Sequence, residues 1–297
     1  MHYNDKNLIE KVIRALSLLE MLVKAGCPLV FKGGTALMLI LGKSAHRLSI
    51  DIDLICPPGT NIEDYLKSFA DFGFINLELV ERKQRDDADI PKSHSKFFYQ
   101  IAYRNDTDAQ SYILLDVLYE DIHYFRTQQI AINCPFIRLE GKPLMVTVPS
   151  AEDILGDKLT AFAPNTTGIP YYRNGRSCSM EIAKQLYDVG RLFENVSDLQ
   201  ITKEAFRKIA VVELSYRSFG TDIGQVFNDI RQTALCISTR GKAGEGDFDL
   251  IQDGIIRVKS FMYKQRYLID HAIIDAARAA YLATLIEKGI NEIESYS

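Results

Sequence analysis

Two aspartates separated by one residue, Asp51 and Asp53, lie in the stretch 48–56, where apolar and acidic residues alternate. This alternation predicts a strand with its apolar residues on one face and its acids on the other. Both carboxylates would then project from the same face, and two like charges so close repel unless a cation lies between them. Carboxylate oxygens suit Mg²⁺ or Mn²⁺, which neutralise charge during phosphoryl transfer. An exposed strand face is the alternative interpretation.

A glycine pair precedes these acids. Gly33 and Gly34 join the short apolar run 28–31 to an expected helix at 35–42. Glycines at such a junction let a phosphate approach backbone N–H groups at the positive end of the helix dipole. The Thr35 hydroxyl can donate a further hydrogen bond. A purely structural turn is the alternative, but the nearby acids favour an anion and metal site.

A third acid, Asp116, lies in an otherwise apolar stretch, where a charged residue needs a partner. A metal ion shared with Asp51 and Asp53 would be such a partner. Exposure to solvent and pairing with a lysine remain alternatives.

The elements that position these residues divide the chain into two halves. A helix is expected over 5–25, with Asn4 or Asp5 as its N-cap, and strands over 48–56, 74–80, 97–103 and 112–118. Beyond residue 149 the spacing is helical, with helices expected over 150–163, 180–194, 202–216 and 271–289. We therefore predict an α/β domain at 1–149 with a mixed sheet, and an all-helical domain at 150–297.

The composition is that of an ordinary globular protein. The 297 residues are 47% hydrophobic and 25% charged with a net charge of −4, which excludes disordered, collagen-like and coiled-coil classes. Five scattered cysteines without a CxxC motif disfavour a zinc or disulfide framework. No apolar run is long enough for a membrane span and no signal-peptide pattern is present, so a cytoplasmic protein is expected. The expected oligomeric state is a monomer.

The order K-G-G-T-A-L, then R-L-S-I-D-I-D-L, then a later strand aspartate resembles the nucleotidyltransferase superfamily of DNA polymerase β and the CCA-adding enzymes. Within it, the motifs look like the AbiEii/AbiGii toxin family, which includes the MenT toxins. The resemblance implies a polymerase-β-type fold in the N-terminal half. It assigns metal binding and catalysis to Asp51, Asp53 and Asp116, and NTP binding to Gly33, Gly34, Thr35, Arg47 and Ser49.

The third family motif is matched by SAEDILGDKLTAF. Ser150 and Asp153 predict a helical capping box. Asp157 and Lys158 follow on the same helix, and a solvated helix face is the alternative interpretation. The resemblance places both residues in the active-site cleft, where Lys158 would contact the triphosphate and stabilise the departing pyrophosphate.

The fourth motif is matched by the stretch 183–189, where Lys184 and Asp188 are spaced i, i+4. The resemblance implies that Asp188 positions or deprotonates the acceptor hydroxyl, whereas a surface ion pair with Lys184 is the alternative. Gln185 stands where the family commonly has an acid. Arg173 and Arg176, expected in a loop, could bind phosphate or an acceptor nucleic acid, or be merely exposed.

The resulting hypothesis is a metal-dependent nucleotidyltransferase, the toxin of a bacterial antitoxin-paired system, which transfers NMP from an NTP with release of pyrophosphate. By resemblance, the acceptor is a tRNA 3′ end and the partner is an antitoxin encoded nearby. Transfer to a small molecule or a protein is one alternative. A catalytically silent NTP-binding regulator is another, which the intact acids and Lys158 disfavour.

Overall fold

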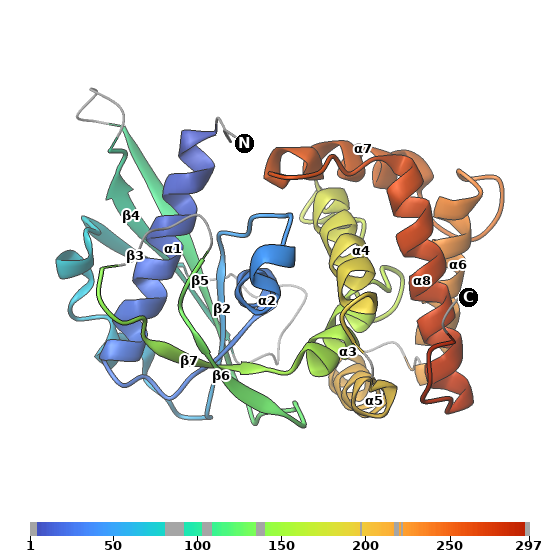
Figure 1. The fold of residues 1–297 in the computed structure, drawn as a ribbon, viewed down its shortest axis with the longest axis horizontal. Coiled ribbons are helices and arrows are strands. Elements are labelled where there is room, and N and C mark those ends of the chain that lie inside the picture. The colour runs from blue at the N-terminus through green and yellow to red at the C-terminus, as the bar shows by residue number, and fades with distance from the viewer. Residues whose placement is uncertain are drawn as a thin grey trace. The chain divides into compact units, whose positions relative to one another are not determined.

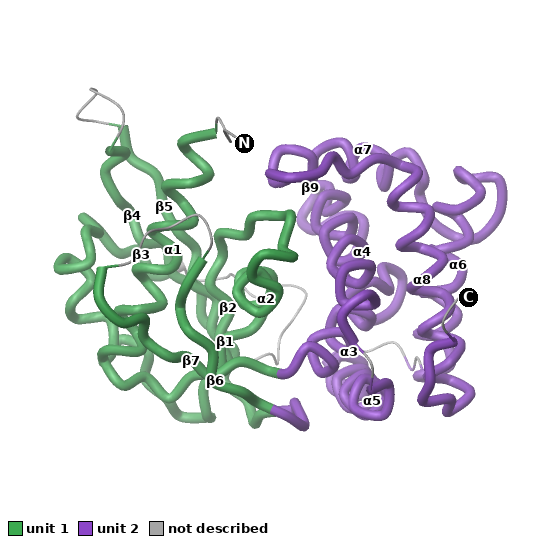
Figure 2. Tube along the Cα trace, viewed as in Figure 1, with its two compact units in different colours: residues 1–122, 127–149 green, residues 123–126, 150–297 purple. Residues whose placement is uncertain are grey.

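A computed structural model of the chain describes residues 5–80, 92–102, 109–134, 140–196, 198–216, 220 and 222–294. The chain divides into two compact units, each treated by itself below (Figure 2). Unit 1 comprises Met1–Ile122 and Thr127–Pro149, and unit 2 comprises His123–Arg126 and Ser150–Ser297. The short segment 123–126 therefore groups with the second unit although it precedes residue 150 in sequence.

Unit 1 is built on a five-stranded sheet with the order β1-β2-β5-β4-β3. Its strands are β1 (Val30–Lys32), β2 (Ile52–Cys56), β3 (Asn76–Val80), β4 (Lys92–Gln100) and β5 (Gln110–Tyr119). The central pair β2 and β5 is parallel and the other pairs are antiparallel, so the mixed sheet expected from the sequence is confirmed. A second, two-stranded sheet pairs β6 (Thr127–Ala131) with β7 (Met145–Pro149).

Two helices pack on this sheet. Helix α1 (Lys6–Lys24) lies across it against β2 and β5 (Figure 1), and its apolar face is buried. The Asp5 carboxylate caps this helix by accepting from Leu8 N at 3.1 Å, whereas Asn4 lies outside the described residues. Helix α2 (Gly33–Leu41) starts at the glycine pair directly after β1, and Gly42 ends it. Short 3₁₀ helices follow at Gly42–Ser44, Ile62–Tyr65 and Phe69–Phe72.

The strands differ by a few residues from their expected bounds, and two of these differences concern the site. Strand β2 starts at Ile52 rather than at residue 48, so Asp51 precedes the strand and only Asp53 lies on it. Strand β4 starts at Lys92, five residues earlier than expected, and the last residue expected of it, Tyr103, lies outside the described residues. The polar start of β4 forms a strand because β5 pairs with it from Lys92 onward and β3 from His94 onward, which satisfies its backbone.

Unit 2 is mainly helical but not all-helical. Its helices are α3 (Ala151–Ala161), α4 (Ser179–Phe193), α5 (Leu199–Ser215), α6 (Ile223–Ser238), α7 (Phe248–Val258), a 3₁₀ turn (Lys259–Phe261) and α8 (Ile269–Lys288). Helices α6 and α7 were not expected from the sequence. A hairpin of β8 (Tyr172–Arg173) and β9 (Arg176–Ser177) corrects the all-helical prediction. Its turn residues, Asn174 and Gly175, both have positive φ, the usual Asn-Gly hairpin geometry.

The expected capping box at the start of α3 is only half present. Ser150 Oγ accepts from Asp153 N at 3.1 Å, as predicted. The Asp153 carboxylate, fully buried, instead accepts from Phe125 N at 2.7 Å and Arg126 N at 3.0 Å. These bonds attach the segment His123–Arg126 to α3.

None of the helices in the described part of the chain is long and apolar enough to cross a membrane.

Candidate active site

A row of ionisable residues crosses the main sheet of unit 1. Lys32 on β1 is paired with Asp53 on β2, Asp53 with Asp116 on β5, and Asp116 with His94 on β4. Side chains at directly paired positions of neighbouring strands point to the same face of a sheet. Two of the three predicted acids, Asp53 and Asp116, are therefore brought side by side on the parallel central strands.

Asp116 has a partner that the sequence analysis did not consider. Its Oδ1 contacts Nδ1 of His94, and the two side chains are 38% and 11% exposed respectively. His94 was missed because the polar segment around it was not expected to be a strand. Residues 92–96 are all polar, so no hydrophobic alternation in the sequence could have identified it. The alternation of buried Ser95 and Phe97 with less buried neighbours is visible only in the structure.

Asp51 is held by a different contact. Its backbone carbonyl accepts a hydrogen bond from the Thr35 hydroxyl at 2.7 Å, and Thr35 is fully buried. Because a hydroxyl has a single proton to donate, this bond uses the donor that was expected to reach a phosphate. In this structure Thr35 therefore ties the start of α2 to the residue before β2, and its contact with a triphosphate stays a prediction.

Three side chains pack closely against the backbone of the glycine pair. Gly33 has φ of +77°, and a Cβ atom on it would lie 2.1 Å from Oδ2 of Asp53. A Cβ atom on Gly34 would lie 2.8 Å from Oγ of Ser49 and 2.9 Å from Nη2 of Arg47. Arg47 and Ser49 are both buried. The structure therefore brings the residues of the first two motifs together, and any larger residue at 33 or 34 would displace them.

The donor chemistry of the row fits a hard divalent cation. Asp53 and Asp116 offer carboxylate oxygens, and Mg²⁺ is typically held by one or two carboxylates together with substrate phosphates and water. Within the described ranges, no group of three or more His, Cys, Asp or Glu side chains is arranged to hold an ion. The assignment of Asp51 as a third metal ligand stays a prediction.

In unit 2, the predicted Lys158 and Asp188 form a buried ion pair. Lys158 Nζ lies 3.0 Å from Oδ2 of Asp188 and donates to Oε1 of Gln185 at 2.9 Å. The side chains of Lys158 and Asp188 are only 8% and 3% exposed. This burial rules out a surface ion pair for Asp188. The Nζ atom of Lys184 lies 4.0 Å from the ring centroid of Phe261, a cation–π contact.

Gln185 has a defined role in this cluster. Where the family commonly has an acid, the neutral amide leaves Lys158 with one carboxylate partner and one neutral acceptor. The carboxylate of Asp188 lies against the Lys158 ammonium, and both side chains are buried. Asp188 thus holds Lys158 in place, and its role toward the acceptor hydroxyl stays a prediction.

A small cavity of about 160 Å³ in unit 2 brings together two more of the predicted residues. Asp157 and Arg173 both line it, with Thr160, Thr167, Gly168 and Glu213 among the other lining residues. Asp157 Oδ2 accepts from the Tyr124 hydroxyl at 2.8 Å. Arg173 and Arg176 are directly paired, exposed residues of the β8–β9 hairpin rather than loop residues.

Asp229 of α6 binds the segment 165–166, which lies beside this cavity. Its carboxylate accepts from Asn165 N at 2.9 Å, Asn165 Nδ2 at 2.8 Å, Thr166 Oγ1 at 2.8 Å and Thr233 Oγ1 at 3.2 Å. Burial raises the pKa of the Asp229 carboxyl, although these four hydrogen bonds act in the opposite direction. Asp229 thus shapes the cavity without lining it.

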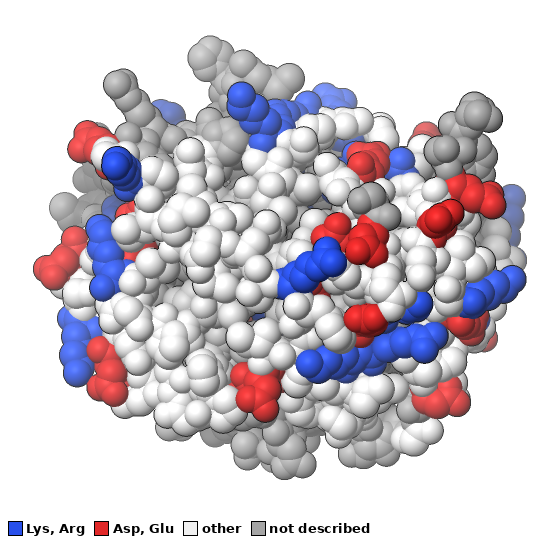
Figure 3. All heavy atoms as spheres, turned by 60° about the horizontal axis from the view of Figure 1, so that its bottom comes forward, with Lys and Arg blue, Asp and Glu red and all other residues white. Residues whose placement is uncertain are grey.

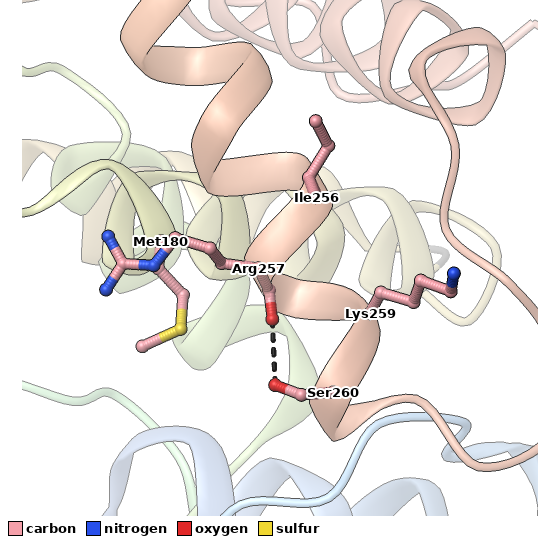
Figure 4. A pocket seen from close by; sticks show the side chains of 5 residues that line it. All are labelled: Met180, Ile256, Arg257, Lys259 and Ser260. Atoms are coloured by element: carbon pink, nitrogen blue, oxygen red, sulfur yellow. Dashed lines mark hydrogen bonds between the residues drawn. The ribbon is translucent and has the colours of Figure 1, made fainter.

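A second, more open hollow of about 530 Å³ in unit 2 is lined by Met180, Ile256, Arg257, Lys259 and Ser260 (Figure 4). It contains none of the residues assigned to the active site from the sequence.

Basic and acidic side chains are interspersed over the face drawn in Figure 3, in keeping with 35 basic and 39 acidic residues. The charge on this face therefore does not identify an acceptor.

Comparison with known proteins places this geometry in a family. The family described as nucleotidyl transferase AbiEii toxin of type IV toxin–antitoxin systems matches residues 16–271. Among solved structures, JHP933 from Helicobacter pylori is similar at 16% identity and a TM-score of 0.46, covering 97% of this chain and 92% of that one. A second H. pylori protein, described provisionally as a nucleotidyltransferase, has 16% identity and a TM-score of 0.44, with 97% and 95% covered.

No curated protein matches the chain. The match to the family spans most of the sequence and includes every motif discussed above. The chain belongs to the AbiEii nucleotidyltransferase toxins of type IV toxin–antitoxin systems, a membership that implies a nucleotide substrate and a cognate antitoxin.

Proposed function

We propose that this toxin transfers NMP from an NTP to an acceptor hydroxyl in a reaction that depends on Mg²⁺ or Mn²⁺, and that the acceptor is the 3′ end of a tRNA. The acceptor oxygen forms a new bond to the α-phosphorus and loses its proton, while the bond to the β-phosphate oxygen breaks and pyrophosphate leaves. The tRNA acceptor rests on the family resemblance of the motifs.

The observation that supports this function best is the pairing of Asp53 with Asp116 on the parallel strands β2 and β5, beside the backbone of Gly33. Asp53 covers the first residue of α2, whose N-terminal backbone N–H groups suit phosphate oxygens. An acid pair and a phosphate-binding helix start thus lie within one unit. Positioning and charge neutralisation are what phosphoryl transfer needs most.

Asp53 and Asp116 would hold the divalent ion together with Asp51, the third acid that the resemblance assigns to it. When bound, the ion neutralises charge on the triphosphate oxygens. Arg47 and Ser49, buried against Gly34, are placed to orient the triphosphate, while Thr35 holds the loop that contains Asp51.

For unit 2 we propose that Lys158 contacts the triphosphate and that Asp157, Arg173 and Arg176 bind nucleotide or acceptor. These roles rest on the resemblance of the motifs. The buried pair with Asp188 supports the role of Lys158, because the neighbouring carboxylate holds the ammonium in one position. A fixed positive charge is suited to stabilising pyrophosphate as it departs.

The test is incubation of the full chain with each labelled NTP, Mg²⁺ or Mn²⁺, and total cellular RNA and protein, followed by separation on gels. We expect label on tRNA, and none with Asp53→Asn or Asp51→Ala at unchanged thermal stability. Lys96→Gln, on the same sheet but in an exposed ion pair with Glu78, is the matched control and should keep full activity.

Other outcomes would change the proposal in defined ways. Label on protein or on a small molecule, and never on RNA, would refute the tRNA acceptor. Binding of NTP without any transfer would refute the enzymatic role in favour of a regulator. Wild-type activity of Asp53→Asn would refute the metal assignment. Growth arrest on expression, relieved by the same substitution and by the neighbouring gene product, would test the toxin role separately.

A further inference from the structure

We propose that His94 is a positioning residue for the metal site: its Nδ1–H holds one oxygen of Asp116 so that the other oxygen is presented toward Asp53 and the divalent ion. This inference rests on the proposed metal-dependent function, which it deepens. The sequence analysis assigned no role to this histidine.

The strand register places His94 where this role requires. His94 is directly paired with Asp116 on one side of β5, and Asp53 is directly paired with Asp116 on the other. Asp116 is thus flanked by a carboxylate and an imidazole at the same level of the sheet. Its contact with Nδ1 of His94 involves Oδ1, which leaves Oδ2 for another ligand.

The chemistry of the pair determines its direction. A carboxylate that binds a cation is ionised and only accepts hydrogen bonds, so in the proposed site Nδ1 of His94 is the donor. Ligating carboxylates are commonly held by hydrogen bonds of this kind, and loss of such a partner typically weakens metal binding or activity by about 10- to 100-fold. The imidazole is only 11% exposed, so water cannot easily replace it as a donor.

Three substitutions separate positioning from general packing. His94→Leu removes the donor, whereas His94→Asn places an amide N–H the same number of bonds from the backbone as Nδ1. His94→Gln moves that donor one bond further out. Lys96→Gln is the control, because Lys96 lies two residues along the same face of β4 but pairs with the exposed Glu78.

The measurement is the affinity of the full chain for Mn²⁺ alone, without nucleotide, from the electron paramagnetic resonance signal of free Mn²⁺. We expect affinity to fall roughly 10- to 100-fold in His94→Leu and His94→Gln. Affinity should stay close to wild type in His94→Asn and Lys96→Gln. In the transfer assay, the Mn²⁺ concentration for half-maximal rate should rise in parallel, with a smaller change in the maximal rate.

Unchanged or tighter Mn²⁺ binding in folded His94→Leu would overturn the inference, and tighter binding would show that His94 competes with the ion. If His94→Leu does not fold, equal affinities of His94→Asn and His94→Gln would overturn it. Failure of the proposed function is distinguishable, because a wild-type chain that binds Mn²⁺ through this site but labels no acceptor refutes only the transfer reaction.

Discussion

Removal of the Asp188 charge tests the buried ion pair of unit 2 most directly. Asp188→Asn keeps the shape of the side chain but leaves the Lys158 ammonium without its only charged partner among the described contacts. Both side chains are less than a tenth exposed, so water cannot compensate for the loss. Breaking a pair as buried as this one costs about 3–5 kcal/mol.

This cost gives a measurable shift. For a unit of this size, each kcal/mol lowers the melting temperature by about 2–4 °C, so we expect a decrease of roughly 6–20 °C by calorimetry. The double variant Lys158→Met, Asp188→Leu replaces the pair with apolar groups and should recover most of that stability. Transfer activity should nevertheless be absent in the double variant, because it lacks Lys158, which is proposed to contact the triphosphate.

The control is Arg257→Gln, which breaks an ion pair with Asp253 in which both side chains are about half exposed. Its effect should stay within about 1 kcal/mol. A change of less than about 1 kcal/mol for Asp188→Asn would refute the reasoning that the pair is buried and uncompensated. A double variant as unstable as the single one would show that packing, rather than the orphaned charge, is responsible.

Three further predictions follow from the described contacts. Gly33→Ala should abolish transfer, because its Cβ would lie 2.1 Å from the Asp53 carboxylate. The control is Gly26→Ala, where φ is a similar +73° but the space around the Cβ is open. It should cost only about 1 kcal/mol of backbone strain and keep activity. Thr35→Val should lower the free energy of unfolding by about 1–3 kcal/mol, because it orphans the Asp51 carbonyl, and Thr35→Ser should not. Burial raises the pKa of the Asp275 carboxyl above its usual value. The contribution of this group to stability is therefore present at low pH and is lost as pH rises through the folded pKa. Denaturation experiments should show that the free energy of unfolding of Asp275→Asn, relative to wild type, increases from pH 4 to pH 7.

Each of these predictions has a result that would contradict it. Equal loss of activity in Gly33→Ala and Gly26→Ala would mean that backbone strain alone is responsible. Equal stability of Thr35→Val and Thr35→Ser would deny the hydroxyl its structural role. An Asp275→Asn variant that becomes relatively less stable as pH rises would show that Arg191 and Arg278 outweigh burial.

Much of the architecture was predictable from local pattern. The helical spacing of apolar residues predicted α1, α3, α4, α5 and α8, and the mixed sheet followed from short apolar runs with polar connections. Helices α6 and α7 were missed, although Asp222 and Gln225 form a capping box whose spacing is visible in the sequence. The β8–β9 hairpin was missed as well, despite its Asn-Gly turn.

The sequence by itself determined which residues offer chemistry: the Gly33-Gly34 pair, the acids Asp51, Asp53 and Asp116, and the later Lys158 and Asp188. Motif spacing identifies such residues because the site needs glycines that let a phosphate reach the backbone, and charged side chains, at particular positions along the chain. It did not determine the partners, because a partner depends on contacts between segments far apart in the chain.

Only the tertiary structure decided those partners. The sheet register paired Asp53 with Asp116 and Asp116 with His94, and one residue of slippage would have turned each side chain to the other face. Helix packing buried Lys158 against Asp188 and Gln185, which converts a pair of surface-like charges into a buried one. Local sequence therefore selected the functional groups, and long-range packing selected what each of them contacts.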